Sequence, residues 1–262
     1  KIIGKKRGTI TTNDGVIISA DKFEYDKIKN VLKAKGNITV NDKANNYIIN
    51  SENILYLRDQ EKIQIKGKSS SLIFANYNFK SEDIVILRDK LILESNKPTT
   101  IIDKKNQTLY EIDKLSFSIK DEILKGEKIF INTKFNQPFS DNYFFKNAIF
   151  NLKDQSYIAK DIDINLKKDI FGNKKNDPRF KGISSSSKNG VTTIDKGIFT
   201  SCKKSDKCPP WSVQAEKITY DQNKKQVLYD SALIKVYDVP VMYFPKFFHP
   251  GPTVKRQSGL LV

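Results

Sequence analysis

The sequence predicts an all-β protein built as an elongated stack of two-stranded units. Three observations support this fold class. Apolar and polar residues alternate with a period of two over most of the chain, which is typical of strands with one buried face. Apolar anchor residues recur about every 31 residues, at Phe23, Ile54, Ile84 and Leu115. Turn-forming Asp, Asn, Lys and Gly residues separate the alternating runs, so each unit is expected to return as a second strand.

Length and composition allow one large all-β domain or two ordinary ones. The chain has 262 residues, and 38% of them are hydrophobic. Its 46 basic and 30 acidic residues give a net charge of +16, which suggests an anionic partner such as a membrane surface or a phosphorylated lipid. Nearly all of the excess is lysine spread among aspartates, so a compositional bias is the competing explanation. Nucleic-acid modules cluster arginine and aromatic residues on one face, so no nucleic-acid partner is expected.

The termini and hydropathy of the sequence do not decide its compartment. The chain contains no run of 18 apolar residues, so no transmembrane helix is expected. It begins at Lys1 without the pattern of a signal peptide. Both features fit the trimmed, mature part of a larger protein, and both also fit a cytosolic protein.

Each predicted unit consists of a strand, a polar turn and a returning strand. The first strands are expected at residues 19–26, 50–59, 80–89 and 111–117, and the series continues around Ile149 and Ile218. The returning strands are expected at residues 31–40, 62–67, 124–131 and 159–164. Gly36, Gly67 and Gly126 hold similar places in their units, where a glycine can mark a bulge or bend. One unit cannot bury its apolar face alone, so stacked units would share a continuous core.

The apolar positions of these strands form the predicted inner face. The residues expected to point inward are Phe23, Tyr25, Ile38, Val40, Ile54, Tyr56, Ile63, Ile65, Ile84, Ile86, Leu115, Phe117, Ile129, Ile131, Ile162 and Ile164. Polar neighbours such as Glu24, Gln64 and Asp163 are expected to point outward, because successive side chains of a strand face opposite ways.

The alternating pattern fails between residues 167 and 190. Turn-forming residues and the run Ser184–Ser187 predict a polar insertion there, either mobile or able to bind a partner. Strands are expected again at residues 191–195, 197–200, 211–220 and 226–237. Trp211 follows two prolines and is expected to anchor the core, with the lining of a ligand path as the alternative.

Two cysteines, Cys202 and Cys208, lie six residues apart in a loop-like run. In an oxidising compartment they could form a local disulfide, one of them could pair with another part of the protein, or both could be free thiols. Zinc is disfavoured because His249 is the only histidine and lies far away in the sequence. The spacing also excludes a redox C-x-x-C motif.

No catalytic constellation stands out in the sequence. A hydrolytic triad would depend on His249, which lies in a proline-rich tail and is expected to pack among aromatic residues. Acidic residues recur once per unit just before a strand, as solvated turn positions do: Asp21, Glu52, Asp83 and Asp113. Neither nucleotide-binding glycine motif is present. The sequence therefore predicts no enzyme activity, no metal site and no cofactor.

The C-terminal stretch, residues 239–262, differs from the repeats. Prolines at 240, 245, 250 and 252 divide it into short pieces with aromatic residues between them. Because proline lacks the N–H that a central strand or a helix needs, the stretch is expected to be extended and edge-like. Residues 255–262 look like a basic turn followed by the start of another strand.

This stretch is also where the chain resembles a known family. Val239–Pro250, followed by Lys255–Leu260, resembles the segment that precedes the barrel in the LptD family (also called Imp or OstA). The similarity extends back to Trp211–Ile218. Members of this family assemble lipopolysaccharide at the outer membrane. Over residues 1–165 the resemblance is limited to the pattern of repeats.

The resemblance implies a fold and a transport function. It predicts a twisted OstA-like β-jellyroll over residues 1–238, with the insertion at about 167–190, and a hinge with the first residues of a missing transmembrane β-barrel over 239–262. The chain would be the part of an outer-membrane protein that faces the periplasm. Its inward residues would shield the acyl chains of lipopolysaccharide. The residues of the hand-over segment would be Pro240, Tyr243, Pro245, Phe247, Phe248, Pro250, Lys255 and Arg256.

The resemblance also implies partners. Lipopolysaccharide would arrive from an LptA-like bridge protein by strand-edge addition, the usual mode for an exposed sheet edge. An LptE-like lipoprotein would bind through the missing barrel. Family members use cysteines near this region in disulfides, some of them with the barrel. This supports a disulfide at Cys202 or Cys208 without choosing its partner.

Two rival functions remain open at this stage. A structural or adhesive β-solenoid would have a closed core and no lipid path. A polysaccharide-acting enzyme on a β-helix would gather acidic and basic residues on one face of successive repeats. The resemblance of residues 239–262 to the LptD family argues against both of these functions. The lack of a catalytic set of residues in the sequence argues further against the enzyme.

Overall fold

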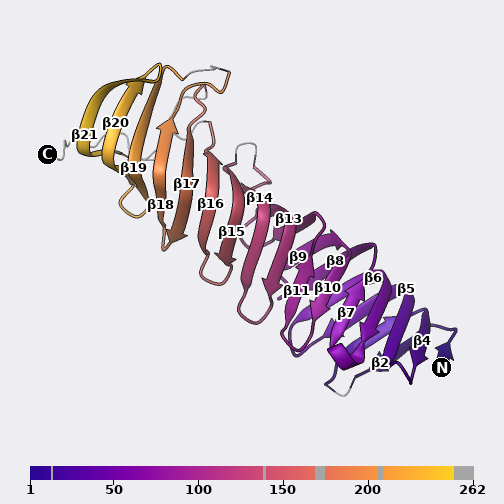
Figure 1. The fold of residues 1–262 in the computed structure, drawn as a ribbon. Helices are drawn as coiled ribbons and strands as arrows, with labels where there is room; N and C mark the ends of the chain where they lie inside the picture. The colour runs from indigo at the N-terminus through magenta and orange to yellow at the C-terminus, as the bar shows by residue number, and fades with distance from the viewer. Residues whose placement is uncertain (13, 138–139, 169–174, 206–208, 251–262) are drawn as a thin grey trace. The chain divides into compact units, whose positions relative to one another are not determined.

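The structure is a computed structural model that describes residues 1–12, 14–137, 140–168, 175–205 and 209–250. The described chain is all-β, with a single 3-10 turn, η1 (Arg58–Gln60), between strands (Figure 1). The all-β class predicted from the alternating pattern is therefore confirmed. The chain divides into two compact units, unit 1 (Lys1–Glu127) and unit 2 (Lys128–Val262), which are described separately below. Strand β14 (Ile123–Thr133) contributes residues to both.

Unit 1 is a folded sheet with two walls. Its strands are β1 (Ile2–Gly4), β2 (Gly8–Thr11), β3 (Ile17–Ala20), β4 (Lys22–Asp26), β5 (Val31–Asp42), β6 (Tyr47–Leu57), β7 (Lys62–Ile65), β8 (Lys68–Ile73), β9 (Tyr77–Glu82), β10 (Ile84–Leu87), β11 (Ile92–Ser95), β12 (Thr99–Asp103) and β13 (Thr108–Ser118). The first wall contains β1, β4, β7, β10 and β11, and the second wall contains β2, β3, β8, β9 and β12.

The long strands β5, β6 and β13 belong to both walls. The C-terminal half of β6 pairs with β7 in the first wall, and its N-terminal half pairs with β8 in the second wall. Strand β13 divides in the same way between β11 and β12. Pairing from β6 through β7, β10, β11, β13, β12, β9 and β8 returns to β6 and closes a ring of eight strands. Phe79 of the second wall packs on Phe117 of the first, with ring centroids 5.2 Å apart.

Left-handed residues mark the line where the chain bends from one wall to the other. Gly36 has φ of 78° and Gly67 has φ of 83°, as expected for the predicted bends. Gly126 is not in this conformation, and Lys128 takes it two residues later with φ of 48°. A side chain in the left-handed region costs roughly 1–2 kcal/mol, a cost that a packed fold tolerates. Glycines therefore reveal only some of the bends.

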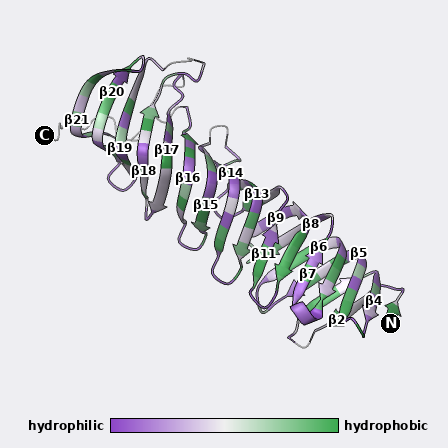
Figure 2. Ribbon diagram, in the orientation of Figure 1, coloured by the Kyte–Doolittle hydropathy of each residue, from purple (hydrophilic) through white to green (hydrophobic). Residues whose placement is uncertain are grey.

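Unit 2 is an antiparallel meander in which each strand pairs with the next. Its strands after β14 are β15 (Asn142–Asn151), β16 (Ser156–Asn165), β17 (Arg179–Lys188), β18 (Val191–Thr200), β19 (Trp211–Asp221), β20 (Gln226–Val236) and β21 (Val239–Pro250). Asp161, Lys196 and Ser231 have φ of 50°, 46° and 55° in the middle of their strands, where the pairing skips a step. Hydrophobic and hydrophilic residues alternate along these strands (Figure 2).

The predicted polar insertion at 167–190 is too long. Residues 179–188 form strand β17, which pairs on both sides, and the serine run lies within it. Ser185 is only 2% exposed and lies opposite Ala159 and Ile194. Backbone pairing does not need apolar side chains, so a row of serines can continue a sheet. The alternating pattern cannot detect such a strand.

Residues 239–250 of the C-terminal segment form a strand of unit 2. Strand β21 pairs with β20 along its whole length. In the described part of the chain β21 has a neighbour on one side only, which explains why three prolines fit within it. The prediction of an extended, edge-like segment is confirmed for residues 239–250. The boundary predicted at 238/239 stays a prediction, because residues 251–262 lie outside the described residues.

The left-handed bends make a stability prediction. A Cβ added at Gly67 meets no atom within 4 Å, so Gly67→Ala tests the backbone strain alone. We expect Gly67→Ala to lower the free energy of unfolding by roughly 1–2 kcal/mol in urea denaturation. Gly8→Ala is the control, because its backbone is not left-handed and its added Cβ makes ordinary contacts with Lys6 and Phe23. An equal loss in both variants would contradict the strain argument.

Candidate functional site

The interior of unit 1 is a continuous apolar surface. Cross-strand partners form one inner row in the first wall: Tyr25, Leu32, Tyr56, Ile63, Ile86, Leu93 and Phe117. A second inner row crosses the second wall: Ile18, Val40, Ile49, Ser71, Phe79, Ile101 and Tyr110. Successive strands supply one residue each, and every member of the two rows is aliphatic or aromatic except Ser71.

The predicted inward orientation is confirmed. Fifteen of the sixteen residues predicted to point inward are buried, and Tyr25 is half-buried. Several side chains of unit 1 are completely buried, including Phe79, Phe117, Ile63 and Ile84. Their side chains fill the interior in this conformation. A ligand between the walls would therefore require the walls to separate, and contact with lipid remains a prediction for all sixteen.

The side of unit 1 away from the bends is here called the mouth. The turns of the first wall form the first turn row, at residues 27–30, 58–61, 88–91 and 119–122. Those of the second wall form the second turn row, at residues 12 and 14–16, 43–46, 74–76 and 104–107. Backbone bonds link successive turns of one row, such as Arg88 N–H to Glu61 O at 2.8 Å and Phe74 N–H to Asn46 O at 2.9 Å. Such bonds join all four turns of the first row, and they join the turns at 43–46, 74–76 and 104–107 of the second row.

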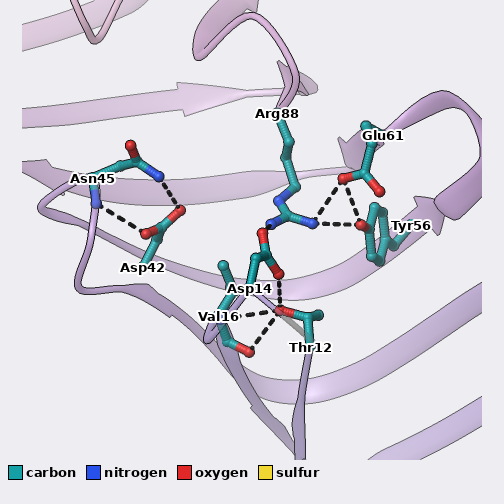
Figure 3. A network of polar contacts seen from close by, with 8 residues as sticks. All are labelled: Thr12, Asp14, Val16, Asp42, Asn45, Tyr56, Glu61 and Arg88. Atoms are coloured by element: carbon teal, nitrogen blue, oxygen red, sulfur yellow. Dashed lines mark hydrogen bonds and ion pairs between the residues drawn. The ribbon is translucent and has the colours of Figure 1, made fainter.

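A buried arginine joins the two turn rows (Figure 3). Arg88 follows β10 in the first turn row, and its side chain is only 6% exposed. Its guanidinium donates to the Tyr56 hydroxyl and to Glu61 Oε2, the latter at 2.9 Å. It also forms an ion pair with Asp14 of the second turn row, 74 positions away in the sequence. The Thr12 hydroxyl donates to the same Asp14 carboxylate.

The Arg88 cluster has a counterpart one repeat earlier. Arg58 donates to the Tyr25 hydroxyl at 2.9 Å and lies 5.7 Å from its ring centroid, and Arg88 lies 5.4 Å from the Tyr56 centroid. Sequence reasoning missed these arginines. The signal was present in the tripeptide Leu-Arg-Asp, which occurs at 57–59 and again at 87–89. Among the described residues, Arg88 has an acidic partner from the opposite row and Arg58 does not.

Burial sets the charge states at the mouth. It raises the pKa of Tyr56 to about 12, with further support from its bond to Glu61. Burial also raises the pKa of Tyr47 on the second wall, where the Asp42 carboxylate adds to the effect and Arg88 opposes it. The bond from Thr12 lowers the pKa of Asp14, and the charge of Arg88 lowers it further. At neutral pH both tyrosines are therefore neutral and Asp14 is charged.

Two hollows lie at the bends of the sheets. One of about 920 Å³ in unit 1 is lined by Lys68, Lys80 and Lys97 with serine and asparagine side chains. Another of about 700 Å³ in unit 2 is lined by Phe130, Phe144 and several lysines. Their linings also include buried residues, such as Ile38 in unit 1 and Ile129 in unit 2.

The predicted hand-over segment is largely exposed on β21. Tyr243 is 58% exposed, and Val239, Val241 and Met242 beside it are similarly open. Pro240 and Pro245 are exposed, whereas Phe247, Phe248 and Pro250 are half-buried against unit 2. Lys255 and Arg256 lie outside the described residues. The described segment therefore presents an apolar strip at the edge of a sheet.

His249 packs among aromatic side chains, as predicted. Its ring lies 5.6 Å from the centroids of Phe199 and Tyr229. Nδ1 lies 2.8 Å from the Pro250 carbonyl oxygen, which can only accept, so Nδ1 carries the proton. Nε2 then accepts from the Tyr229 hydroxyl at 2.9 Å. Burial lowers the pKa of His249, which favours this neutral form.

Trp211 does not lie where the sequence predicted, and of the two cysteines only Cys202 is among the described residues. Trp211 is 36% exposed at the first position of β19, so the predicted core anchor is wrong. It contacts Phe199 edge-on at the strand end, with 5.9 Å between centroids. The Cys202 sulfur lies 3.6 Å from the Trp211 carbonyl oxygen. Cys208 lies outside the described residues, so a disulfide with it stays a prediction.

Comparisons with known proteins do not assign the chain to a family: no family model matches it, and no curated protein matches it. Among the residues that the structure describes, no helix has the length and apolar character needed to cross a membrane. Within the same residues, no group of three or more His, Cys, Asp or Glu side chains is arranged to hold a metal ion.

The burial of His249 predicts a pH dependence of stability. Because the folded state holds this histidine at a lowered pKa, the unfolded state binds the proton more readily. The stabilisation that comes from neutral His249 is fully present above the pKa of histidine in the unfolded chain, about 6.5. It is lost as the pH falls below that value toward the lowered pKa of the folded state. We expect the free energy of unfolding, measured in urea, to fall between about pH 7 and pH 5.5.

The control is His249→Phe, which keeps an aromatic ring and removes the only histidine. The pH-dependent difference between the two proteins isolates the histidine from any carboxyl group that titrates nearby. Parallel pH profiles for the two proteins would contradict the assignment.

Proposed function

We propose that this chain is the periplasmic part of an LptD-like protein that transports lipopolysaccharide to the outer-membrane surface. Acyl chains would lie between the two walls, and the phosphorylated head group would project at the mouth. The likeness of residues 239–250, 255–260 and 211–218 to that family supports this proposal. The basic net charge of +16 fits an anionic cargo.

The observation that carries the proposal is the way the walls are joined. Backbone strands connect them along the line of bends, and side chains such as Arg88 and Asp14 connect them at the mouth. Separating the turn rows would expose both inner rows without breaking a strand pair. Shielding each CH₂ group is worth about 0.8 kcal/mol, so several acyl chains would compensate for lost wall-to-wall packing.

The finer architecture belongs to the same proposal. The fold would be a twisted OstA-like jellyroll that opens along the mouth and leads into a transmembrane β-barrel. An LptA-like bridge protein would add a strand to the free edge at β1 and β2, where Ile2 and Ile3 are exposed. Strand β21 would hand the lipid to the barrel, which would also hold an LptE-like lipoprotein. No catalytic step, metal or cofactor is required.

A structural or adhesive β-solenoid is the second candidate. The observation that favours it is the filled interior of unit 1, where Phe79 and Phe117 pack directly on each other. In that case the interior would serve only as a core, and lipid would have no effect on it.

Photocrosslinking of neighbouring residues separates the two candidates. A photoreactive residue would replace Ile63 or Ile84, which point inward, and in matched variants Gln64 or Val85, their outward neighbours. In cells that make lipopolysaccharide, we expect adducts at Ile63 and Ile84 and none at Gln64 and Val85. Adducts at none of the four positions, in protein shown to be folded and assembled, would leave the solenoid as the better account.

A further inference from the structure

We propose that Arg88 is a binding site for a phosphate group carried by an acylated amphiphile, and that Asp14 occupies this site when no ligand is present. The proposal rests on the proposed transport function and adds the residue that receives the charged head group. It also assigns to Asp14 the role of an internal competitor that holds the mouth closed.

The guanidinium of Arg88 is only partly used. Its Nη1 bonds to Tyr56 and Glu61 of the first turn row, and its Nη2 pairs with Asp14. Its Nε is buried and has no hydrogen-bond partner. Carboxylate and phosphate groups characteristically bind arginine through two parallel N–H donors. The Nε and Nη2 edge of Arg88 therefore has one donor occupied and one donor empty.

A second group whose hydrogen bonding is incomplete lies on the opposite wall. The Tyr47 hydroxyl is buried and makes no hydrogen bond of normal geometry, although the Asp42 carboxylate and the Arg88 guanidinium lie within reach of it. Buried polar groups are normally satisfied, so each exception calls for a partner. A phosphate has enough oxygens to bond to Nε, Nη2 and the Tyr47 hydroxyl together. Asp14, as it is held here, satisfies only one of them.

The position of Asp14 makes it exchangeable. Its side chain is 59% exposed, whereas that of Arg88 is 6% exposed. When Asp14 leaves, its carboxylate can return to water, while the buried Arg88 needs another anion in its place. A phosphate that enters from the mouth would supply that anion. The exchange would also break the ion pair between the turn rows, so capture of the head group and opening of the mouth become one event.

The neighbouring geometry fits an amphiphile. Tyr56 lies beneath the Arg88 guanidinium and is also a member of the first inner row, next to Ile63. A phosphate at Arg88 would thus lie where the apolar interior begins. Acyl chains attached to it could enter between the walls directly.

Binding measurements on the full chain test the proposal. The probes are lipid A, the same lipid after removal of its phosphates, and inorganic phosphate. We expect Asp14→Asn to bind lipid A roughly tenfold more tightly than the wild-type chain, which corresponds to about 1.4 kcal/mol of binding free energy. Arg88→Gln should bind lipid A at least roughly tenfold more weakly than the wild-type chain. Asp14→Asn and Arg88→Gln should change binding of the dephosphorylated lipid in the same direction, because both remove the ion pair that holds the mouth closed and this lipid has no phosphate for Arg88 to bind.

Arg58→Gln is the matched control, because Arg58 stacks on Tyr25 as Arg88 does on Tyr56 but has no acidic partner from the opposite row. We expect it to bind lipid A like the wild-type chain. Asp14→Asn keeps the proposal testable if Arg88→Gln fails to fold, because Asp14 is exposed.

The outcomes separate this inference from the transport function. If the wild-type chain binds lipid A and Asp14→Asn binds it with the same affinity, the Arg88 site is overturned and transport stands. If the wild-type chain binds neither lipid, the transport function fails and the Arg88 site fails with it. Binding of inorganic phosphate as tight as that of lipid A would overturn the assignment to an amphiphile.

Discussion

The long strands of unit 1 each belong to two walls, and this backbone continuity determines where the fold is strong and where it is weak. Strand β6 pairs with β7 in one wall and with β8 in the other. Along the bends the walls are therefore held by covalent backbone, with left-handed residues such as Gly67 at the turning points. At the mouth no strand crosses between the described turns, so side chains decide how firmly the walls close.

This division explains why a buried charge is placed at the mouth. An arginine at 6% exposure is costly unless anions surround it, and Arg88 obtains Glu61 from its own row and Asp14 from the other. The apolar rows supply most of the attraction between the walls, whereas the arginine couples their separation to the arrival of another anion. An apolar pair at the same place would close the mouth without this dependence on charge.

The sequence was informative wherever structure depends on local alternation. Ile63 and Ile84 could be assigned to the interior because a strand alone determines which side chains share a face. The pairing of Asp14 with Arg88 could not be predicted. The two residues lie 74 positions apart in the sequence, and their contact depends on how the two walls fold together. The serine strand around Ser185 was missed for a different reason. Its pairing uses the backbone and leaves no apolar pattern to detect.

The proposed function requires the mouth of unit 1 to open when an anionic lipid binds. Spin labels at Lys43 in the second turn row and Lys90 in the first, both exposed, would report the distance across it, with Cys202 and Cys208 replaced by serine. Pulsed electron–electron double resonance on the full chain should show that this distance becomes longer when lipid A is added. An unchanged distance with lipid A bound would contradict the account.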